Sequence, residues 1–103
     1  MLNEILKRYQ EKEEEYSKEI ESTFTHYTTT VSTPEMAANL RSCVLLGCMM
    51  EVMKPKRAMD LGSGVSSYAL RYFKGKFKYR TEIYSVDSDW DWLKKSKEFC
   101  EVR

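Results

Sequence analysis

Several residue types are scarce in this chain, and each scarcity excludes a class of protein. Its 103 residues include four glycines and two prolines, which excludes collagen-like and low-complexity chains. The longest apolar run is eight residues, from Cys43 to Met50, whereas a membrane-spanning helix needs about 20. The first residues contain no apolar core of a secretory signal. We therefore expect a globular chain that does not span a membrane.

Cysteine and excess charge of either sign are also scarce. The three cysteines, Cys43, Cys48 and Cys100, form no Cys-x-x-Cys pair. Their odd number and spacing predict reduced thiols in a cytoplasmic protein, rather than a disulfide framework or a zinc site. The 17 basic and 16 acidic residues leave a net charge of +1. The chain as a whole therefore has no electrostatic preference for nucleic acid or acidic membranes.

The first part of the chain, residues 1–33, predicts an N-terminal helix and a connecting segment. Apolar residues at helical spacing over 1–22, interrupted at Glu13, favour an amphipathic helix that docks on the rest of the domain. A coiled-coil partner helix is the alternative. Segment 22–33 is rich in serine and threonine, and its β-branched residues 28–31 disfavour a helix, so we expect an extended connection.

The single histidine, His26, lies in this expected connection. It is either an exposed loop residue or, because imidazole titrates near neutral pH, a general base or a substrate contact. Tyr27 and Tyr68 are further candidates for proton transfer on the chemistry of their side chains alone. The sequence does not choose among these three residues.

The second part, residues 34–103, has the alternating pattern of a partial α/β domain. Thr33 and Pro34 are typical of a helix start, and the helix is expected to run from Pro34 to about Met53. The later segments predict a strand, a helix, a strand and a helix in turn. These segments are 57–61, 65–73 (ended by Gly75), 82–86 and 90–102. The predicted fold class is α/β, with N-terminal helices followed by the first βαβα portion of an incomplete parallel sheet.

A glycine loop follows the first predicted strand, in the sequence Asp-Leu-Gly-Ser-Gly at 60–64. Backbone N–H groups at the start of the next helix favour a carboxylate or another anion, and glycine lets the backbone approach a ligand closely. Asp87 ends the second strand, and the carboxyl ends of neighbouring parallel strands lie beside each other. A carboxylate there can accept both hydroxyls of a ribose. The two features predict a site for a nucleoside-containing cofactor.

In these features the chain resembles the class I S-adenosylmethionine (SAM)-dependent methyltransferases. Their first motif is an acid, a glycine and a second glycine after the first strand, which Asp60, Gly62 and Gly64 match. Their acid at the end of the second strand matches Asp87. The resemblance covers roughly residues 34–102 and implies a partial SAM-binding, Rossmann-like domain.

Two further features resemble the small-molecule O-methyltransferases of that superfamily: Pro55-Lys56 before the strand and Ser66 just after the loop. The resemblance implies that SAM is the cofactor and a small molecule the methyl acceptor. It assigns cofactor-binding roles to Asp60, Gly62, Ser63, Gly64, Ser66, Asp87 and Ser88.

The implied roles follow the parts of SAM. The glycines and serines of the loop would hold the methionine half, with Ser63 and Ser66 donating to its carboxylate and Asp60 attracting its ammonium group. Asp87 would accept the ribose hydroxyls. Ser88, which matches the position after the acid, or Trp90, on the chemistry of its ring alone, would lie near the adenine.

Two other interpretations of the residues stay open. A dinucleotide-binding oxidoreductase is one, although Ser67 stands where its fingerprint has a third glycine and Asp60 where its strand is apolar. The other is a non-enzymatic module for nucleotides or single-stranded nucleic acid. Segment 54–80 has eight basic residues and one acid, and 71–80 alternates bases with aromatics, which suits phosphate contacts and base stacking. The same alternation is also expected of a solvated helix end whose aromatics pack inward.

The sheet of a class I methyltransferase has several more strands than the two predicted here. We therefore expect the N-terminal piece of a longer protein, a truncated reading frame, or a homo-oligomer that forms through the open sheet edge or the N-terminal helix. The family's acceptor pocket and most of its catalytic groups belong to later segments. The resemblance thus assigns cofactor binding to this chain but identifies neither the acceptor nor the general base. The residues show no metal-binding pattern.

Overall fold

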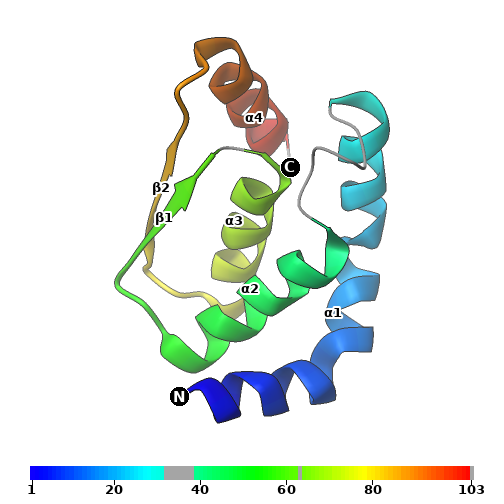
Figure 1. Cartoon of the computed structure of the whole chain (residues 1–103), viewed down its shortest axis with the longest axis vertical. Helices are drawn as coiled ribbons and strands as arrows, with labels where there is room; N and C mark the ends of the chain where they lie inside the picture. Colours follow the sequence, from blue (N-terminus) through cyan, green and yellow to red (C-terminus); the bar gives the residue numbers. More distant parts are fainter. Residues whose placement is uncertain (32–38, 63, 103) are drawn as a thin grey trace.

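The computed structural model describes residues 1–31, 39–62 and 64–102, apart from the side chain of Val102. Within this part of the chain the fold is α/β, with four helices and two strands (Figure 1). In chain order the elements are α1 (Leu2–Thr30), α2 (Leu40–Met53), β1 (Arg57–Leu61), α3 (Val65–Phe77), β2 (Glu82–Val86) and α4 (Trp90–Val102). The predictions of both strands and of the last helix are confirmed.

The two strands form a parallel sheet, as predicted, and α3 connects them. Arg57 lies opposite Glu82 at one end of the ladder, and Leu61 lies opposite Val86 at the other. In Figure 1 the helices lie on one side of the strands, with α3 beside the sheet and α1 farthest from it. One sheet face is therefore packed against helices, while the other is left to solvent.

The core lies where α3 meets α2 and α1. Phe73 of α3 is fully buried, and its ring centroid lies 5.3 Å from that of Tyr16 in α1. Helix α2 approaches the same ring at Gly47, where a Cβ atom would lie only 2.6 Å from Phe73. Val44 and Cys48 of α2 are also fully buried. The packing of α3 on α2 thus depends on glycine at position 47, which leaves room for the Phe73 ring, as well as on apolar side chains.

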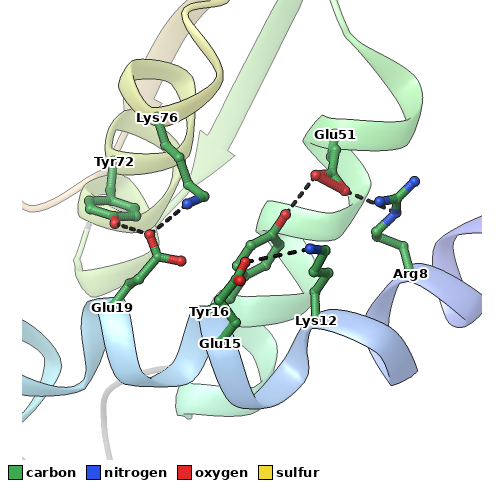
Figure 2. A network of polar contacts seen from close by, with 8 residues as sticks. All are labelled: Arg8, Lys12, Glu15, Tyr16, Glu19, Glu51, Tyr72 and Lys76. Atoms are coloured by element: carbon green, nitrogen blue, oxygen red, sulfur yellow. Dashed lines mark hydrogen bonds and ion pairs between the residues drawn. The ribbon is translucent and has the colours of Figure 1, made fainter.

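A polar cluster around Glu51 of α2 fastens the first half of α1 (Figure 2). The Tyr16 hydroxyl donates to Glu51 Oε1 at 2.6 Å, and Arg8 Nε lies 3.0 Å from Glu51 Oε2. Helix α1 also buries the apolar side chains of Ile5 and Ile20 within this chain. The prediction that the N-terminal helix docks on the domain is therefore confirmed.

A second cluster, around Glu19, fastens α1 to α3 (Figure 2). Glu19 Oε1 accepts hydrogen bonds from the Tyr72 hydroxyl at 2.7 Å and from Lys76 Nζ at 2.6 Å. Burial acts to raise the pKa of Glu19, but the hydrogen bonds from Lys76 and Tyr72 outweigh it and lower the pKa below its ordinary value. The ionised carboxylate therefore stabilises this contact.

The extended connection expected over 22–33 is wrong as far as Thr30, because α1 continues through it. Threonine side chains bond back to carbonyls one turn earlier: Thr29 Oγ1 donates to Thr25 O at 2.8 Å and Thr30 Oγ1 to His26 O at 2.6 Å. Tyr27 is also 1% exposed, so this end of the helix is held by packing. Burial and these bonds outweigh the low helix propensity of threonine.

The continuous helix expected from Pro34 to about Met53 is wrong at its start. Helix α2 begins at Leu40, because Asn39 is extended (φ −77°, ψ 165°) and its side chain accepts the Ser42 backbone N–H at 2.8 Å. Asparagine is a strong helix N-cap, and Asn39 therefore sets the start of α2. Residues 34–38 lie outside the described part of the chain. The helix ends at Met53, as expected.

The break expected at Gly75 is also wrong, since α3 runs on to Phe77. A glycine inside a helix costs about 1 kcal/mol relative to alanine. The extra turn, residues 74–77, brings Phe77 against Phe73 and Tyr16, with ring centroids 5.8 and 6.1 Å away. The helix ends instead at Lys78, whose backbone is left-handed (φ +59°). Aromatic packing here outweighs the helix-breaking tendency of one glycine.

Among the described residues, Cys43, Cys48 and Cys100 form no disulfide with one another. Burial raises the pKa of Cys43 and of Cys48 to about 11, so both are poor nucleophiles at neutral pH. No helix in the described part of the chain combines the length and the apolar character needed to cross a membrane.

Candidate functional site

The glycine loop and the second-strand acid lie beside each other at the carboxyl ends of β1 and β2. The Gly62 N–H donates to Val86 O at 2.7 Å, which extends the parallel ladder one step beyond the strands. Asp87 follows Val86 directly and is half-buried. The adjacency that the sequence predicts for these two features is therefore confirmed.

The structure favours glycine at the two glycine positions of the loop for different reasons. Gly62 has a positive φ of 92°, which side chains rarely adopt, although a Cβ there would meet open space. Gly64 is the N-cap of α3, and a Cβ there would lie 3.1 Å from the Tyr27 hydroxyl. The close neighbour of Gly64 is thus a residue from the end of α1. Ser63 lies outside the described residues.

Asp60 lies under the loop rather than in open solvent. It is 8% exposed and points from β1 toward the start of α3. Its carboxylate accepts hydrogen bonds from Ser66 Oγ, at 2.9 Å, and from Ser67 Oγ. A carboxylate at a helix N-terminus also interacts favourably with the helix dipole. Asp60 therefore anchors the first turn of α3 to the end of β1.

The hydrogen-bond network continues from Ser67 to residues that the sequence analysis did not assign to the site. Ser67 Oγ accepts the Gly64 N–H at 3.1 Å, and Ser85 of β2 donates to it at 3.2 Å. Arg71 Nη1 donates to Ser67 O at 3.0 Å and to Ser85 Oγ at 3.1 Å. Two features of the sequence are consistent with this network. Ser85 lies between two outward-facing positions of β2, so it faces the helices, and Arg71 follows Ser67 by one helical turn.

The second strand ends in a turn that orients the acids before α4. Asp87 Oδ1 accepts the Asp89 N–H at 3.0 Å, and Asp89 Oδ1 accepts the Trp92 N–H at 3.2 Å. Asp89 is therefore the cap of α4, and Asp87 stabilises the turn that precedes it. Ser88, between them, is exposed. Trp90 is 73% exposed beside the same turn.

The three candidates for proton transfer lie around the ring of Phe99 in α4. His26 is exposed and stacks on Phe99, with ring centroids 6.2 Å apart. Tyr27 and Tyr68 are buried. Burial raises the pKa of Tyr27, against a smaller opposing effect of the nearby Ser96. A buried phenol with a raised pKa is a poor base at neutral pH.

The aromatics of segment 71–80 turn inward, as expected of a helix end with aromatics in the core. Phe73 and Phe77 pack on α1, and the Tyr79 hydroxyl donates to Glu51 O at 3.3 Å. Lys76 is ion-paired with Glu19. These rings therefore do not form an exposed platform on which bases could stack.

Comparison of the chain with protein-family models, with curated proteins and with solved structures finds no match. Among residues 1–31, 39–62 and 64–102, no three histidine, cysteine or acidic side chains lie together as metal ligands would. The arrangement at the strand ends consists of loop backbone, a half-buried carboxylate and an exposed serine. Such groups can bind a polar ligand that carries a ribose and a charged end.

Proposed function

We propose that the chain is the SAM-binding part of a class I methyltransferase with a Rossmann-like sheet, acting on a small-molecule acceptor. The observation that carries the proposal is the Gly62 N–H bond to Val86 O, since it sets the glycine loop beside Asp87. The order of helix, strand, glycine loop, helix, parallel strand, acid and helix supports it. Ligands of open parallel sheets bind at this end of the strands.

In this proposal the ligand is held by four groups around the strand ends. The backbone around Gly62 and Gly64, with Ser63 between them, lines the methionine half of SAM. Asp87 accepts hydrogen bonds from the ribose hydroxyls, and Ser88 adjoins the adenine. SAM, when bound, supplies a methyl group on a positively charged sulfur.

The hydrogen bonds under the loop change the roles of two of the assigned residues. The single hydroxyl proton of Ser66 goes to Asp60, so the carboxylate of SAM would be bound by loop N–H groups rather than by Ser66. Asp60 supplies negative charge beneath the loop and holds the helix start in place. It therefore acts on the ammonium group through its charge and not through direct contact.

The proposal is tested by calorimetric titration of the folded chain with SAM and S-adenosylhomocysteine. We expect saturable binding that Asp87→Asn weakens about ten-fold or more, because a charged acceptor of the ribose hydroxyls is lost. Asp91→Asn removes the same charge from an exposed position in the first turn of α4 and serves as the control. Absence of binding by a folded chain, or equal effects of the two substitutions, would refute the proposal.

A second candidate function rests on the opposite end of the sheet. A pocket of about 500 Å³ there is lined by a basic cluster of five residues with Glu82 as the acid. The cluster consists of Lys54, Lys56, Arg57, Lys78 and Arg80. Such a cluster suits the phosphates of single-stranded nucleic acid without base stacking. Binding of a labelled oligothymidylate that weakens steeply with salt, weakens further in Arg80→Gln and ignores SAM would favour this module over the methyltransferase.

A further inference from the structure

A pocket separate from the strand ends lies between α3, β2 and α4. Its volume is about 500 Å³, and none of the seven residues assigned to the SAM site lines it. Arg71 and Lys97 bring positive charge, and Ser67, Ser85 and Ser96 bring hydroxyls. Leu93 and Cys100 add an apolar wall. The lining thus combines cations and donors on one side with apolar contact on the other.

Arg71 is held in place at this pocket by its neighbours. One of its nitrogens, Nη1, donates to both Ser67 O and Ser85 Oγ, so the guanidinium is oriented before any ligand arrives. Among the described residues, no carboxylate lies within ion-pair distance of Arg71. A half-buried guanidinium has five N–H donors in a planar fork that matches a carboxylate or a phosphate. Its remaining donors therefore suit an anionic acceptor.

Ser96 contributes to the wall of the pocket, but its hydroxyl is enclosed. Its side chain is 3% exposed, and its Oγ has no hydrogen-bond partner in the described part of the chain. The nearby Tyr27 hydroxyl is also buried and also lacks a hydrogen-bond partner among the described residues. Two hydroxyls paired with each other would still leave one O–H without an acceptor. Both oxygens expose less than 1 Å², so they lie behind the pocket wall rather than on its open surface.

We propose that this pocket binds a small organic anion. Its carboxylate or phosphate group accepts hydrogen bonds from the free edge of Arg71, and Lys97 adds a second positive charge. The apolar part of the ligand lies against Leu93 and Cys100. Glu101, which pairs with Lys97 at 3.9 Å, is exposed and marks the outer rim.

The test is an NMR titration of the full ¹⁵N-labelled chain with phenyl phosphate, benzoate and the neutral benzamide. We expect saturable shifts of the Ser67, Ser85 and Ser96 amides with the two anions and none with benzamide. Comparison of phenyl phosphate with benzoate then separates the two sources of negative charge.

Three substitutions identify the charges responsible. Arg71→Gln is expected to weaken phenyl phosphate binding about ten-fold or more, because a charged hydrogen bond is lost. Lys97→Gln is expected to weaken it by about three-fold, as for an exposed charge. Lys94→Gln removes the same charge from an exposed position on α4 that does not line the pocket, and it should have no effect.

Lys97 is exposed, so its substitution tests the site even where Arg71→Gln perturbs the fold. Shifts by benzamide equal to those by benzoate, or equal weakening by Lys97→Gln and Lys94→Gln, would overturn the proposal. Absence of saturable shifts with either anion would do the same.

Discussion

The two faces of the β1–β2 sheet differ sharply in their surroundings. Side chains that point toward the helices are buried or half-buried: Ala58, Asp60, Ile83 and Ser85. Their neighbours on the opposite face are large, apolar and exposed: Met59, Leu61, Tyr84 and Val86. Leu61, for example, is 79% exposed although it is the last residue of a parallel strand. One face therefore packs into the hydrophobic core, and the other face is not covered by any described element of the chain.

The difference teaches what kind of unit this sheet belongs to. Parallel sheets occur almost only where both faces are covered, and their strands are apolar on both faces for that reason. The exposed face of this sheet carries large apolar side chains, which are typical of a buried sheet face. It is thus suited to packing against further elements, as the proposed Rossmann-like domain requires.

The largest effect is expected in the core on the helix side of the sheet. Phe73→Ala should lower the free energy of unfolding by about 3–5 kcal/mol, because it leaves a cavity between α3, α2 and α1. Met59→Ala, on the exposed face, should change it by less than about 0.5 kcal/mol. Urea denaturation followed by circular dichroism measures both. Similar losses for the two variants would mean that the exposed face is in fact covered.

Asp60 should have the next largest effect, since it points toward the helices. Asp60→Ala leaves the buried Ser67 hydroxyl without its acceptor, so we expect a loss of about 1–3 kcal/mol in unfolding free energy. Ser66→Ala removes one donor but leaves the bond from Ser67, and it should cost less than about 1 kcal/mol. Denaturation midpoints rank the two variants. The reverse ranking would contradict an anchoring role for Asp60.

The contact of α1 with α3 should make stability depend on pH through Glu19. Its pKa in the folded chain lies below the ordinary value of 4.5, so it contributes stability that is present above pH 4.5 and is lost as the pH falls through the folded value. Glu19→Gln should lower stability at pH 7 and flatten this acid dependence. Thermal unfolding from pH 7 to pH 3 measures both. An unchanged acid profile in Glu19→Gln would contradict the assignment.

The smallest effect is expected on the exposed sheet face. Tyr84→Lys should change the free energy of unfolding by less than about 0.5 kcal/mol, because half of the side chain is already in solvent. It should also reduce any self-association through this sheet, since lysine discourages edge and face pairing. Sedimentation velocity measures association alongside denaturation. A large loss of stability in a monomer would show that Tyr84 belongs to the core.

The regular alternation of segments was enough to predict β1, β2, α4 and the meeting of the glycine loop with Asp87. Helix ends were harder to predict, because burial decides them. Burial of Tyr27 and hydrogen bonds from threonine side chains to backbone carbonyls extend α1 beyond residue 22. Packing of Phe77 extends α3 beyond Gly75. Neither burial nor those bonds can be read from local propensity.

The residues around the candidate site were predictable only where they belong to a motif. Asp60 was identified by its place before the glycines, but its bonds to Ser66 and Ser67 depend on how α3 starts. Arg71 was grouped with the basic segment 71–80, since the sequence does not reveal that it turns toward Ser85. Such contacts between α3 and β2 are set by tertiary packing, not by spacing along the chain.

The most direct test of the central claim is to map S-adenosylhomocysteine onto the folded, ¹⁵N-labelled chain by NMR. The account predicts saturable shifts of Gly62, Gly64, Asp87 and Ser88 at the strand ends. It also predicts their loss in Gly62→Val, which forces a branched side chain into a backbone with φ of 92°. Shifts confined to other parts of the chain, or shifts at the strand ends that persist in Gly62→Val, would contradict a cofactor site at this loop.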